Sequence, residues 1–557
     1  MAWPVLIVGA GPVGLTAAVS LRQQGIDCRV VEKAAKRTNQ SRAAIIHART
    51  LELLESLGLA GMFLAEGVKV HGASIHTTDG HRIAHFQIDH LPTHYPYFLG
   101  LNQSETERLL TEELSRLNLE IDREVELIGF TQNDEEVEAQ LRHGDGTLES
   151  LKASYLLGCD GSRSATRHQL GLNLEGDTLD DQWLTADVRI DWDHPRDEAI
   201  AFLSSEGFMF VAAMDRDRWR IVANVTGMQF DPEKLPTIET VVEICNRRLG
   251  IKARFYDPVW ISPFAVNTRM VSTMRVKRVF LLGDAAHVHS PVGGQGMNTG
   301  MQDAFNLAWK VALAVKGVAG EALLESYNQE RHANAKRLLS FVGPATKMVN
   351  LHNPLTIAGR NMLMRLASVM GAGGMIAKRM SELDVHYRGS SIVGEHFIPL
   401  SEWIHSLLHG ESHPGLLDCW DFGRGPRPGE RAPEAHVAEF GRELRLFTDW
   451  LGDHRHQVLV FTGIHPAHRR VEELIQTVSD IENKAGTLLR PRLIRAASVT
   501  AATGLVDPDS ETHHIYGARY ECLYLIRPDG YVAFRSQPVD IKALTGFLEK
   551  IFEHSVI

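Results

Sequence analysis

Cysteine is scarce in this chain of 557 residues, and its five cysteines lie far apart. None belongs to a CxxC pair or to a cluster with the spacing of a zinc site. A disulfide framework and a thiol redox motif are therefore not expected. The histidines at positions 71, 76, 81, 85, 90 and 94 form no compact pair with a third ligand, and we expect no metal site.

Long apolar runs and excess positive charge are also lacking. No segment offers the roughly 20 apolar residues that a membrane-spanning helix needs, and Met1 to Pro4 lack the basic region of a signal peptide. The net charge of −11 disfavours general nucleic-acid binding, which needs clustered Lys and Arg. We expect a folded cytoplasmic protein of several domains, with neither nucleic-acid nor membrane partners.

What the chain does contain begins with a strand, a glycine-rich turn and a helix. Pro4 to Val8 is a short apolar run, a GxGxxG turn follows, and Leu15 to Gln24 has a helical pattern. Glycines let the backbone approach a pyrophosphate, and the helix N-terminus offers free amide groups. The pattern predicts a dinucleotide site formed by Gly9, Gly11, Pro12, Val13 and Gly14.

An acidic residue supports this interpretation. The apolar run Cys28 to Val31 ends in Glu32 and Lys33, and Glu32 lies 23 positions after Gly9. A carboxylate at this place accepts hydrogen bonds from the ribose hydroxyls of an adenosine. We therefore assign Glu32 and Lys33 to a Rossmann-type site for FAD or NAD.

Two further turns follow apolar strands. Asp160 and Gly161 come after the run 155–159, and Gly283 and Asp284 come after the run 279–282. A third glycine-rich segment, PVGGQGMN, occupies positions 291–298. Each turn alone is a common strand ending, whereas the ordered set is specific.

The ordered set resembles the class A flavoprotein aromatic hydroxylases of the p-hydroxybenzoate hydroxylase and phenol hydroxylase group, over nearly the whole chain. The resemblance implies that the first turn and Glu32 hold the ADP half of tightly bound FAD. Asp160 and Gly161 would lie where FAD and the nicotinamide cofactor both pass, and Gly283 and Asp284 would bind the ribityl chain. Contacts to the flavin ring are implied for Pro291, Gly294, Gly296, Met297 and Asn298, and further FAD contacts for Arg42, Gln103 and Val125.

Physical chemistry supports these assignments. Reduced flavin is an anion that needs fixed donors, and a helix from about Thr299 to Lys316 would direct its positive end toward that charge. Arg42 could contact phosphate or nicotinamide, or form a surface salt bridge. The run Ser104 to Glu107 predicts a capping box, which would place Gln103 at the start of a helix.

Missing motifs narrow the chemistry further. The only other glycine cluster, Gly371 to Gly374, follows a helical stretch rather than a strand, so no second dinucleotide domain is predicted. NADH or NADPH should therefore bind transiently. The sequence also lacks the redox-active cysteine pair of a disulfide reductase and the WxWxIP motif of a flavin halogenase.

The predicted fold is α/β: a Rossmann-type FAD-binding domain, an inserted β-rich substrate domain and a C-terminal α/β domain. Its divisions are 1–173 and 274–390 for the FAD-binding domain, 174–273 for the substrate domain with 70–100 contributing, and 398–557 for the last domain. This last domain looks like the thioredoxin-like domain of phenol hydroxylases, and a strand, a turn over Pro528 to Gly530 and a strand occur in it. We expect it to serve a structural or dimer-contact role, with a homodimer as the candidate assembly.

Strand-like segments within 174–273 predict one wall of an aromatic substrate pocket. Its candidate lining residues, each of which could instead be ordinary core, are Phe208, Phe210, Trp219, Phe264 and Pro291, with Tyr97 and Phe98. For the base that accepts a phenolic proton, His47, Tyr97 and Arg220 are candidates, and none is needed if the substrate arrives ionised.

The expected reaction uses NAD(P)H and O2 to hydroxylate a small aromatic, phenolic substrate through a flavin C4a-hydroperoxide. Two alternatives stay open. One is a flavin monooxygenase of a polyketide or isoprenoid, and the other is an inactive flavin-binding scaffold.

Overall fold

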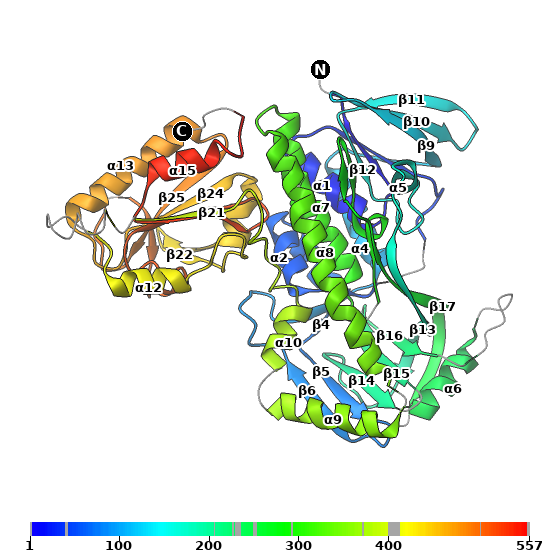
Figure 1. The fold of residues 1–557 in the computed structure, drawn as a ribbon. Coiled ribbons are helices and arrows are strands. Elements are labelled where there is room, and N and C mark those ends of the chain that lie inside the picture. The colour runs from blue at the N-terminus through cyan, green and yellow to red at the C-terminus, as the bar shows by residue number, and fades with distance from the viewer. Residues whose placement is uncertain are drawn as a thin grey trace.

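The computed structural model describes residues 3–38, 43–204, 207–225, 228, 236–248, 253–290, 293–351, 353–369, 373–398, 401, 413–501 and 503–553. Arg42 and Pro291, both expected at the flavin, lie outside the described residues. Figure 1 shows three regions around two central helices, α7 (Gly296–Val315) and α8 (Glu321–Val349).

A six-stranded sheet carries the glycine turns. Its order is β18 (Arg275–Val276), β19 (Val279–Leu281), β12 (Tyr155–Gly158), β1 (Val5–Val8), β2 (Cys28–Glu32) and β8 (Ile121–Arg123). The strands from β19 to β8 are parallel, and β18 is antiparallel. Every residue of β1 is buried, as expected for a parallel strand covered on both faces. The packed helices α1 (Pro12–Gln23), α4 (Gln103–Arg116) and α7 contact one another through α1.

Smaller elements surround this sheet. A hairpin sheet contains β9 (Val125–Gln132), β10 (Val137–His143) and β11 (Leu148–Ala153), and a second small sheet contains β3 (Ile45–Ile46), β7 (Phe98–Gly100) and β4 (Val68–Val70). The accompanying helices are α2 (Ala48–Ser56), α3 (Ala60–Glu66) and α5 (Ala165–Gln169), with a short helical turn, η1 (Gly283–Ala285).

An eight-stranded sheet forms the β-rich region at the lower right of Figure 1. Its order is β20 (His287–Val288), β17 (Arg254–Met270), β13 (Glu175–Asp191), β16 (Arg218–Asn224), β15 (Gly207–Met214), β14 (Glu198–Ser204), β5 (Gly72–Thr77) and β6 (Arg82–Gln87). The strands expected within 174–273 are present, and β5 and β6 come from the segment 70–100. Helices packed nearby are α6 (Ile238–Arg248) on β17, and α9 (Pro354–Val369) and α10 (Gly373–Met380) on β6.

The C-terminal region, at the left of Figure 1, is a mixed sheet with helices. The strand order is β21 (Gly394–Phe397), β28 (Val532–Gln537), β27 (Cys522–Ile526), β24 (His456–Phe461), β25 (Leu489–Ala496), β26 (Leu505–Asp507), β22 (His436–Glu439) and β23 (Arg442–Arg445). Its helices are α12 (Leu416–Arg424), α13 (His468–Ala485), α14 (Glu511–Ile515) and α15 (Ile541–Leu548), with short turns at Leu446–Trp450 and Leu451–Asp453.

The centre of this sheet has the connectivity of a thioredoxin-like fold. Helix α13 joins the parallel strands β24 and β25, whereas β27 is antiparallel to both β24 and β28. Helix α15 follows β28. The expected fold class is confirmed. It consists of an α/β unit, formed by the six-stranded sheet with α1, α4 and α7 and named here the FAD-type unit, together with a β-rich insertion and this C-terminal unit.

Candidate active site

Four strand ends meet at one edge of the six-stranded sheet. Val8 is paired with Val31 of β2 and with Gly158 of β12, and Gly158 is paired with Leu281 of β19. Because these neighbouring strands are parallel, the residues that follow them lie side by side at their carboxyl ends, where open α/β sheets bind ligands. The structure thus brings together three glycine turns that are far apart in the sequence.

The glycines of the first turn have different jobs. Gly9 has φ +106°, and a Cβ there would lie 2.4 Å from the carbonyl oxygen of Cys159. A Cβ at Gly14 would lie 2.0 Å from the carbonyl oxygen of Gly9. Gly11, the N-cap of α1, has no atom within 4 Å of a built Cβ. Gly9 and Gly14 are therefore required by packing, whereas Gly11 faces open space that fits a phosphate group.

Glu32 closes this turn at the end of β2. One carboxylate oxygen accepts a 2.9 Å hydrogen bond from the amide of Ala10, and the other accepts one of 2.9 Å from Ala34. Lys33 beside it is exposed. Val125, buried at the start of β9, follows β8, whose Arg123 is paired with Glu32. Val125 therefore lies near the end of β2, close to Glu32.

Asp160 has a structural task that the sequence did not reveal. Its carboxylate accepts a 2.6 Å hydrogen bond from Ser164 Oγ and 3.0 Å bonds from the amide and hydroxyl of Thr166. It thereby holds the start of α5. Gly161, at φ +75°, has open space around it. In this turn the glycine backbone is thus better placed than the carboxylate to meet a ligand.

The third turn is anchored from behind. The amide of Gly283 donates a 2.9 Å hydrogen bond to the carboxylate of Asp303 in α7. This buried carboxylate also lies 2.6 Å from Arg331 Nε and 2.9 Å from His287 Nε2. Asp284 is exposed at the edge of the turn. The glycine backbone is fixed by a buried ion pair, and the neighbouring carboxylate is exposed to solvent. Asp303 and Arg331 were missed because their pairing depends on helix packing.

Asn298 organises the turn expected at the flavin ring. Its side-chain amide donates to the carbonyl oxygens of Ile45 at 2.8 Å and Gly294 at 3.0 Å, and its oxygen accepts from the amide of His47 at 2.8 Å. Gly294 has φ +65°. Helix α7 begins at Gly296, three residues before the expected start. Its N-terminal end, with Met297 buried in it, therefore reaches directly into this turn.

His47 is buried against the same turn. Its Nε2 lies 2.9 Å from the carbonyl oxygen of Gly293, and its ring meets Phe98 edge-on at 4.9 Å between centroids. Burial lowers the pKa of His47 to about 4. The imidazole is neutral at pH 7 and a weak base, so its geometry favours holding the turn over accepting a phenolic proton.

A second histidine here was not predicted. His289 lies with Nδ1 2.8 Å from the carbonyl oxygen of Ser290, and burial lowers its pKa to about 4. Among the described residues, neither His289 Nε2 nor His47 Nδ1 has a hydrogen-bond partner. Unpaired buried polar atoms are costly. Two such atoms beside one turn fit a ligand that supplies polar groups, as FAD would.

The other two candidate bases are Tyr97 and Arg220. Burial raises the pKa of Tyr97 to about 12, which keeps its hydroxyl protonated. Arg220 forms a buried ion pair with Asp187 of the neighbouring strand, with 2.9 Å between Nη2 and Oδ2.

Gln103 begins α4, where its side chain donates to Glu107 at 2.9 Å. The cap of α4 is Asn102, two residues before the expected capping box, and its side chain accepts from Glu105.

The aromatic candidates separate onto two faces of the eight-stranded sheet. The ring of Trp183 lies 5.9 Å from Phe208 and 6.4 Å from Phe264, and Phe210 packs against the core of the FAD-type unit. Trp219 is buried in the opposite core, beneath α6. Trp219 therefore does not belong with the other three, because successive side chains of a strand point to opposite faces. The fully buried Trp183 lies on the same face as Phe208 and Phe264 and packs beneath them.

The described residues contain neither a cluster of metal ligands nor a membrane-spanning helix. Within the ranges given above, no three His, Cys, Asp or Glu side chains gather as metal ligands. No described helix has the length and apolar character needed to cross a bilayer.

Known proteins share this arrangement. Residues 2–342 match the family described as FAD binding domain. The chain is 35% identical to 6-methylpretetramide 4-monooxygenase of Streptomyces rimosus, over 98% of this chain and 93% of that protein. It is 29% identical to pentachlorophenol 4-monooxygenase of Sphingobium chlorophenolicum, over 96% and 93%.

A solved structure extends the similarity to the whole fold. The anhydrotetracycline hydroxylase of Streptomyces rimosus superposes with a TM-score of 0.74 at 25% identity, with 100% of both chains covered. Sequence and architecture agree over the FAD-type unit, the β-rich sheet and the C-terminal region. The chain belongs to the FAD binding domain family and, within it, to the FAD-dependent monooxygenases that act on aromatic and polyketide substrates.

Proposed function

We propose that this monooxygenase hydroxylates a phenolic ring, either of a simple phenol or of a polycyclic polyketide, with NADH or NADPH as the reductant. The observation that carries the proposal is the aromatic sheet face formed by Trp183, Phe208, Phe210 and Phe264. Flat apolar side chains suit a flat apolar ring. The names of the relatives, one acting on pentachlorophenol and one on 6-methylpretetramide, support both substrate sizes.

The aromatic face lies close to the flavin turn. Strand β7 packs directly on β15. The two backbones are so close at Gly100 that a Cβ there would lie only 2.2 Å from the carbonyl oxygen of Ala213. Phe98 of β7 in turn contacts His47. A ring seated on Phe210 would therefore lie on the side of β7 and the flavin turn, and the surrounding apolar side chains would exclude water.

FAD, when bound, accepts hydride from the nicotinamide cofactor and activates oxygen for insertion into the ring. The residues that would hold it are the first turn and Glu32 at the ADP half, and Gly283 and Asp284 at the ribityl chain. Gly294 and the N-terminus of α7 would offer amide groups to the ring, where negative charge develops. His47, being neutral, fixes this turn without adding a charge to it.

We further propose that the substrate enters already ionised. His47 is too weak a base to take a proton from a phenol near pH 7. Tyr97 stays protonated at this pH and therefore cannot accept one. Arg220 is held by Asp187. The electron-rich phenolate is the form that an electrophilic oxygen attacks, so the rate should rise with pH until the phenol is fully ionised.

Oxygen incorporation tests the proposal. NADH and NADPH consumption would be measured with phenols, naphthols and polycyclic phenols under 18O2, and the products examined by mass spectrometry. We expect substrate-stimulated consumption and one 18O atom in the product. FAD-loaded protein that oxidises NAD(P)H without labelling any phenol would overturn the phenolic assignment, whereas labelling of a non-phenolic isoprenoid would favour that alternative.

Three finer assignments accompany this function. We propose a cytoplasmic location, where NAD(P)H is available and free cysteines stay reduced. We propose Asp160 and Gly161 as the region that the nicotinamide passes. A homodimer in contact through the C-terminal region is tested by sedimentation equilibrium, in which a monomeric mass at micromolar concentration would count against it.

A further inference from the structure

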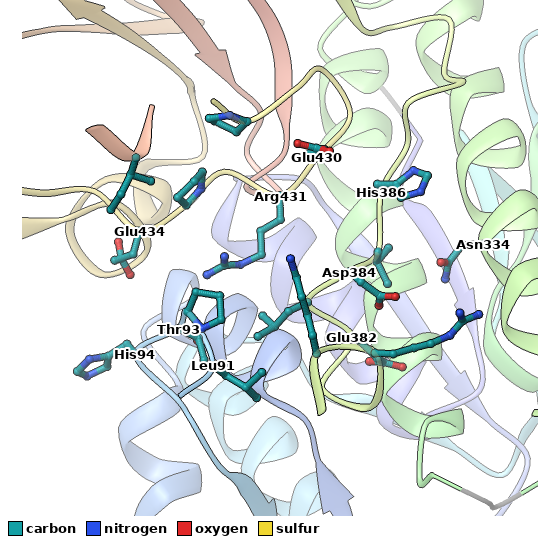
Figure 2. Close-up of a pocket in the computed structure, with 18 of the residues that line it drawn as sticks. Leu91, Thr93, His94, Asn334, Glu382, Asp384, His386, Glu430, Arg431 and Glu434 are labelled. Atoms are coloured by element: carbon teal, nitrogen blue, oxygen red, sulfur yellow. The ribbon is translucent and has the colours of Figure 1, made fainter. Parts of the chain in front are cut away.

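A charged cavity of about 940 Å3 lies between the C-terminal region and the FAD-type unit. Figure 2 shows its walls, which come from the segment 91–94, helix α8, the segment that follows α10, and the loop carrying Glu430 to Glu434. Gln295 and Thr299, at the start of α7, also line it. The cavity therefore touches the back of the turn that would hold the flavin ring.

Glu382 is the carboxyl group that joins this cavity to α7. It lines the cavity, yet only 4% of its surface is exposed. One carboxylate oxygen accepts a 2.8 Å hydrogen bond from Thr299 Oγ1, and the other accepts one of 2.5 Å from Gln302 Nε2. Both donors belong to the first two turns of α7. Glu382 therefore lies beside the positive end of this helix.

The backbone around Glu382 is tied to the same turn. Its φ of +60° is unusual for a residue with a side chain, and such strain persists only where surrounding contacts impose it. The amide of Glu382 donates to the carbonyl oxygen of Arg379 at 3.2 Å. That same carbonyl accepts a 3.1 Å hydrogen bond from Gln295 Nε2. Side chain and backbone thus both connect position 382 to the start of α7.

Charged groups face Glu382 from each neighbouring element. Arg331 of α8 donates to the carbonyl oxygen of Thr299 at 2.9 Å and pairs with Asp303 of α7. Arg379 and Asp384 flank Glu382 in the chain, and Arg431 and Glu434 line the far wall. Burial, opposed by hydrogen bonds from Thr299 and Gln302 and by Arg331, raises the pKa of Glu382 to about 8. Its charge therefore changes just above neutral pH.

We propose that Glu382 is a positioning residue that couples proton exchange with the cavity to the electrostatic field of α7 at the flavin turn. When ionised, it sets a negative charge against the end of the helix that stabilises negative charge on the flavin. When protonated, it removes that charge and leaves the helix end more positive. Protonation should thus favour the reduced flavin. This inference rests on the flavin position proposed above and not on the identity of the aromatic substrate.

The test measures the affinity of oxidised and reduced FAD from pH 6 to pH 9.5, without aromatic substrate, in the wild type and in Glu382→Gln. The amide is isosteric and stays neutral, and Gln302 can turn its own amide over to accept the bond. At pH 6 the two proteins should match. At pH 9.5 the variant should favour reduced over oxidised FAD roughly threefold to tenfold more than the wild type does.

Glu434→Gln is the matched control. Burial raises the pKa of Glu434 to about 7, and its side chain accepts from the amide of Phe447 at 3.1 Å, away from α7. Its affinity ratio should follow the wild type at every pH. An unchanged pH dependence in Glu382→Gln, or an equal change in Glu434→Gln, would overturn the proposal.

A second variant guards against misfolding. Thr299→Val removes a hydrogen bond to the ionised carboxylate, so the pH dependence should persist but move to higher pH. If Glu382→Gln does not fold, an unmoved pH profile in Thr299→Val overturns the proposal. A wild-type protein that binds no FAD would instead contradict the flavin site itself, which separates the two failures.

Discussion

His47 donates a hydrogen bond of 2.9 Å from Nε2 to the carbonyl oxygen of Gly293. Only the neutral tautomer with its proton on Nε2 leaves Nδ1 free as an acceptor, and burial keeps the ring neutral. The imidazole therefore holds the glycine turn together with Asn298, which donates to the carbonyl oxygen of Gly294.

Replacing His47 with alanine should loosen this turn. Losing one buried hydrogen bond costs about 1 to 1.5 kcal/mol, so FAD should bind about tenfold more weakly. Fluorescence of released flavin measures the affinity. His81→Ala is the control, because its side chain is 77% exposed on a distant hairpin. Wild-type affinity in His47→Ala would contradict the assigned role.

Asp284→Ala should also weaken FAD retention. Its carboxylate is the exposed member of the third turn, and we propose that it accepts hydrogen bonds from the ribityl hydroxyls. Hydrogen bonds that involve a charged group contribute about 1.5 to 3 kcal/mol. Equilibrium dialysis would show a loss of about tenfold or more. The variant should keep its stability because the anchor of the turn is the amide of Gly283. Near-complete flavin occupancy in Asp284→Ala would count against the ribityl contact.

The two faces of the eight-stranded sheet predict different outcomes for two aromatic substitutions. Phe210→Ala should raise the KM for the aromatic substrate severalfold while the protein stays folded. Trp219→Ala should instead lower the free energy of unfolding by about 3 to 5 kcal/mol, because it empties the core beneath α6. Urea unfolding and steady-state kinetics distinguish them. A selective KM effect in Trp219→Ala would contradict the assignment of faces.

The ion pair between Glu330 and Arg527 is fully buried. The two side chains meet at 2.6 Å and 2.9 Å, and Lys310 lies 2.8 Å from the same carboxylate. Glu330→Gln leaves Lys310 without its carboxylate partner and Arg527 with Asp529 alone, and it should lower the free energy of unfolding by about 3 to 5 kcal/mol. The exposed pair of Arg469 and Glu473 provides the control, since Arg469→Gln should cost less than about 1 kcal/mol. Equal costs would contradict this account.

Acid should destabilise the protein below pH 6.5. Burial lowers the pKa of His47 and His289 to about 4 and that of His456 to about 3. Between pH 6.5 and pH 4 the unfolded chain binds these protons and the folded chain does not, so stability falls as pH falls. Each histidine should lower the free energy of unfolding by up to about 2 kcal/mol as the pH falls from 6.5 to 5.

His456→Phe isolates one of these contributions. The ring of His456 lies among Trp309 and Phe552, at 5.3 Å and 5.7 Å between centroids, so phenylalanine preserves the packing. Urea midpoints at pH 7 and pH 5 should differ less in the variant than in the wild type. The same pH difference in both proteins would show that His456 does not carry the effect.

Local features of the site could be predicted from the sequence. The first turn, Glu32 and the turn at Gly283 depend on residues adjacent in the chain, and parallel strand order then brings them together. Long-range pairings could not be predicted. Glu52 meets Arg431 across 379 positions, and nothing in either local sequence indicates that both are buried.

The direction of side chains is a second feature that could not be predicted from the sequence. A strand pattern predicts alternation but does not state which face meets which neighbour, and Trp219 was therefore grouped with Phe210. The structural role of Asp160 could not be predicted either, because it depends on how the chain turns to bring Ser164 and Thr166 to the carboxylate.

Buried charges across the C-terminal boundary have a practical consequence for protein engineering. Arg431 pairs with Glu52, the carbonyl of Asp529 accepts from Arg49, and Arg527 pairs with Glu330. Cutting the chain near residue 398 would remove the partners of Glu52, Arg49 and Glu330 and expose an interface that is buried in the intact protein. Chimaeras between relatives should therefore exchange both members of each contact together.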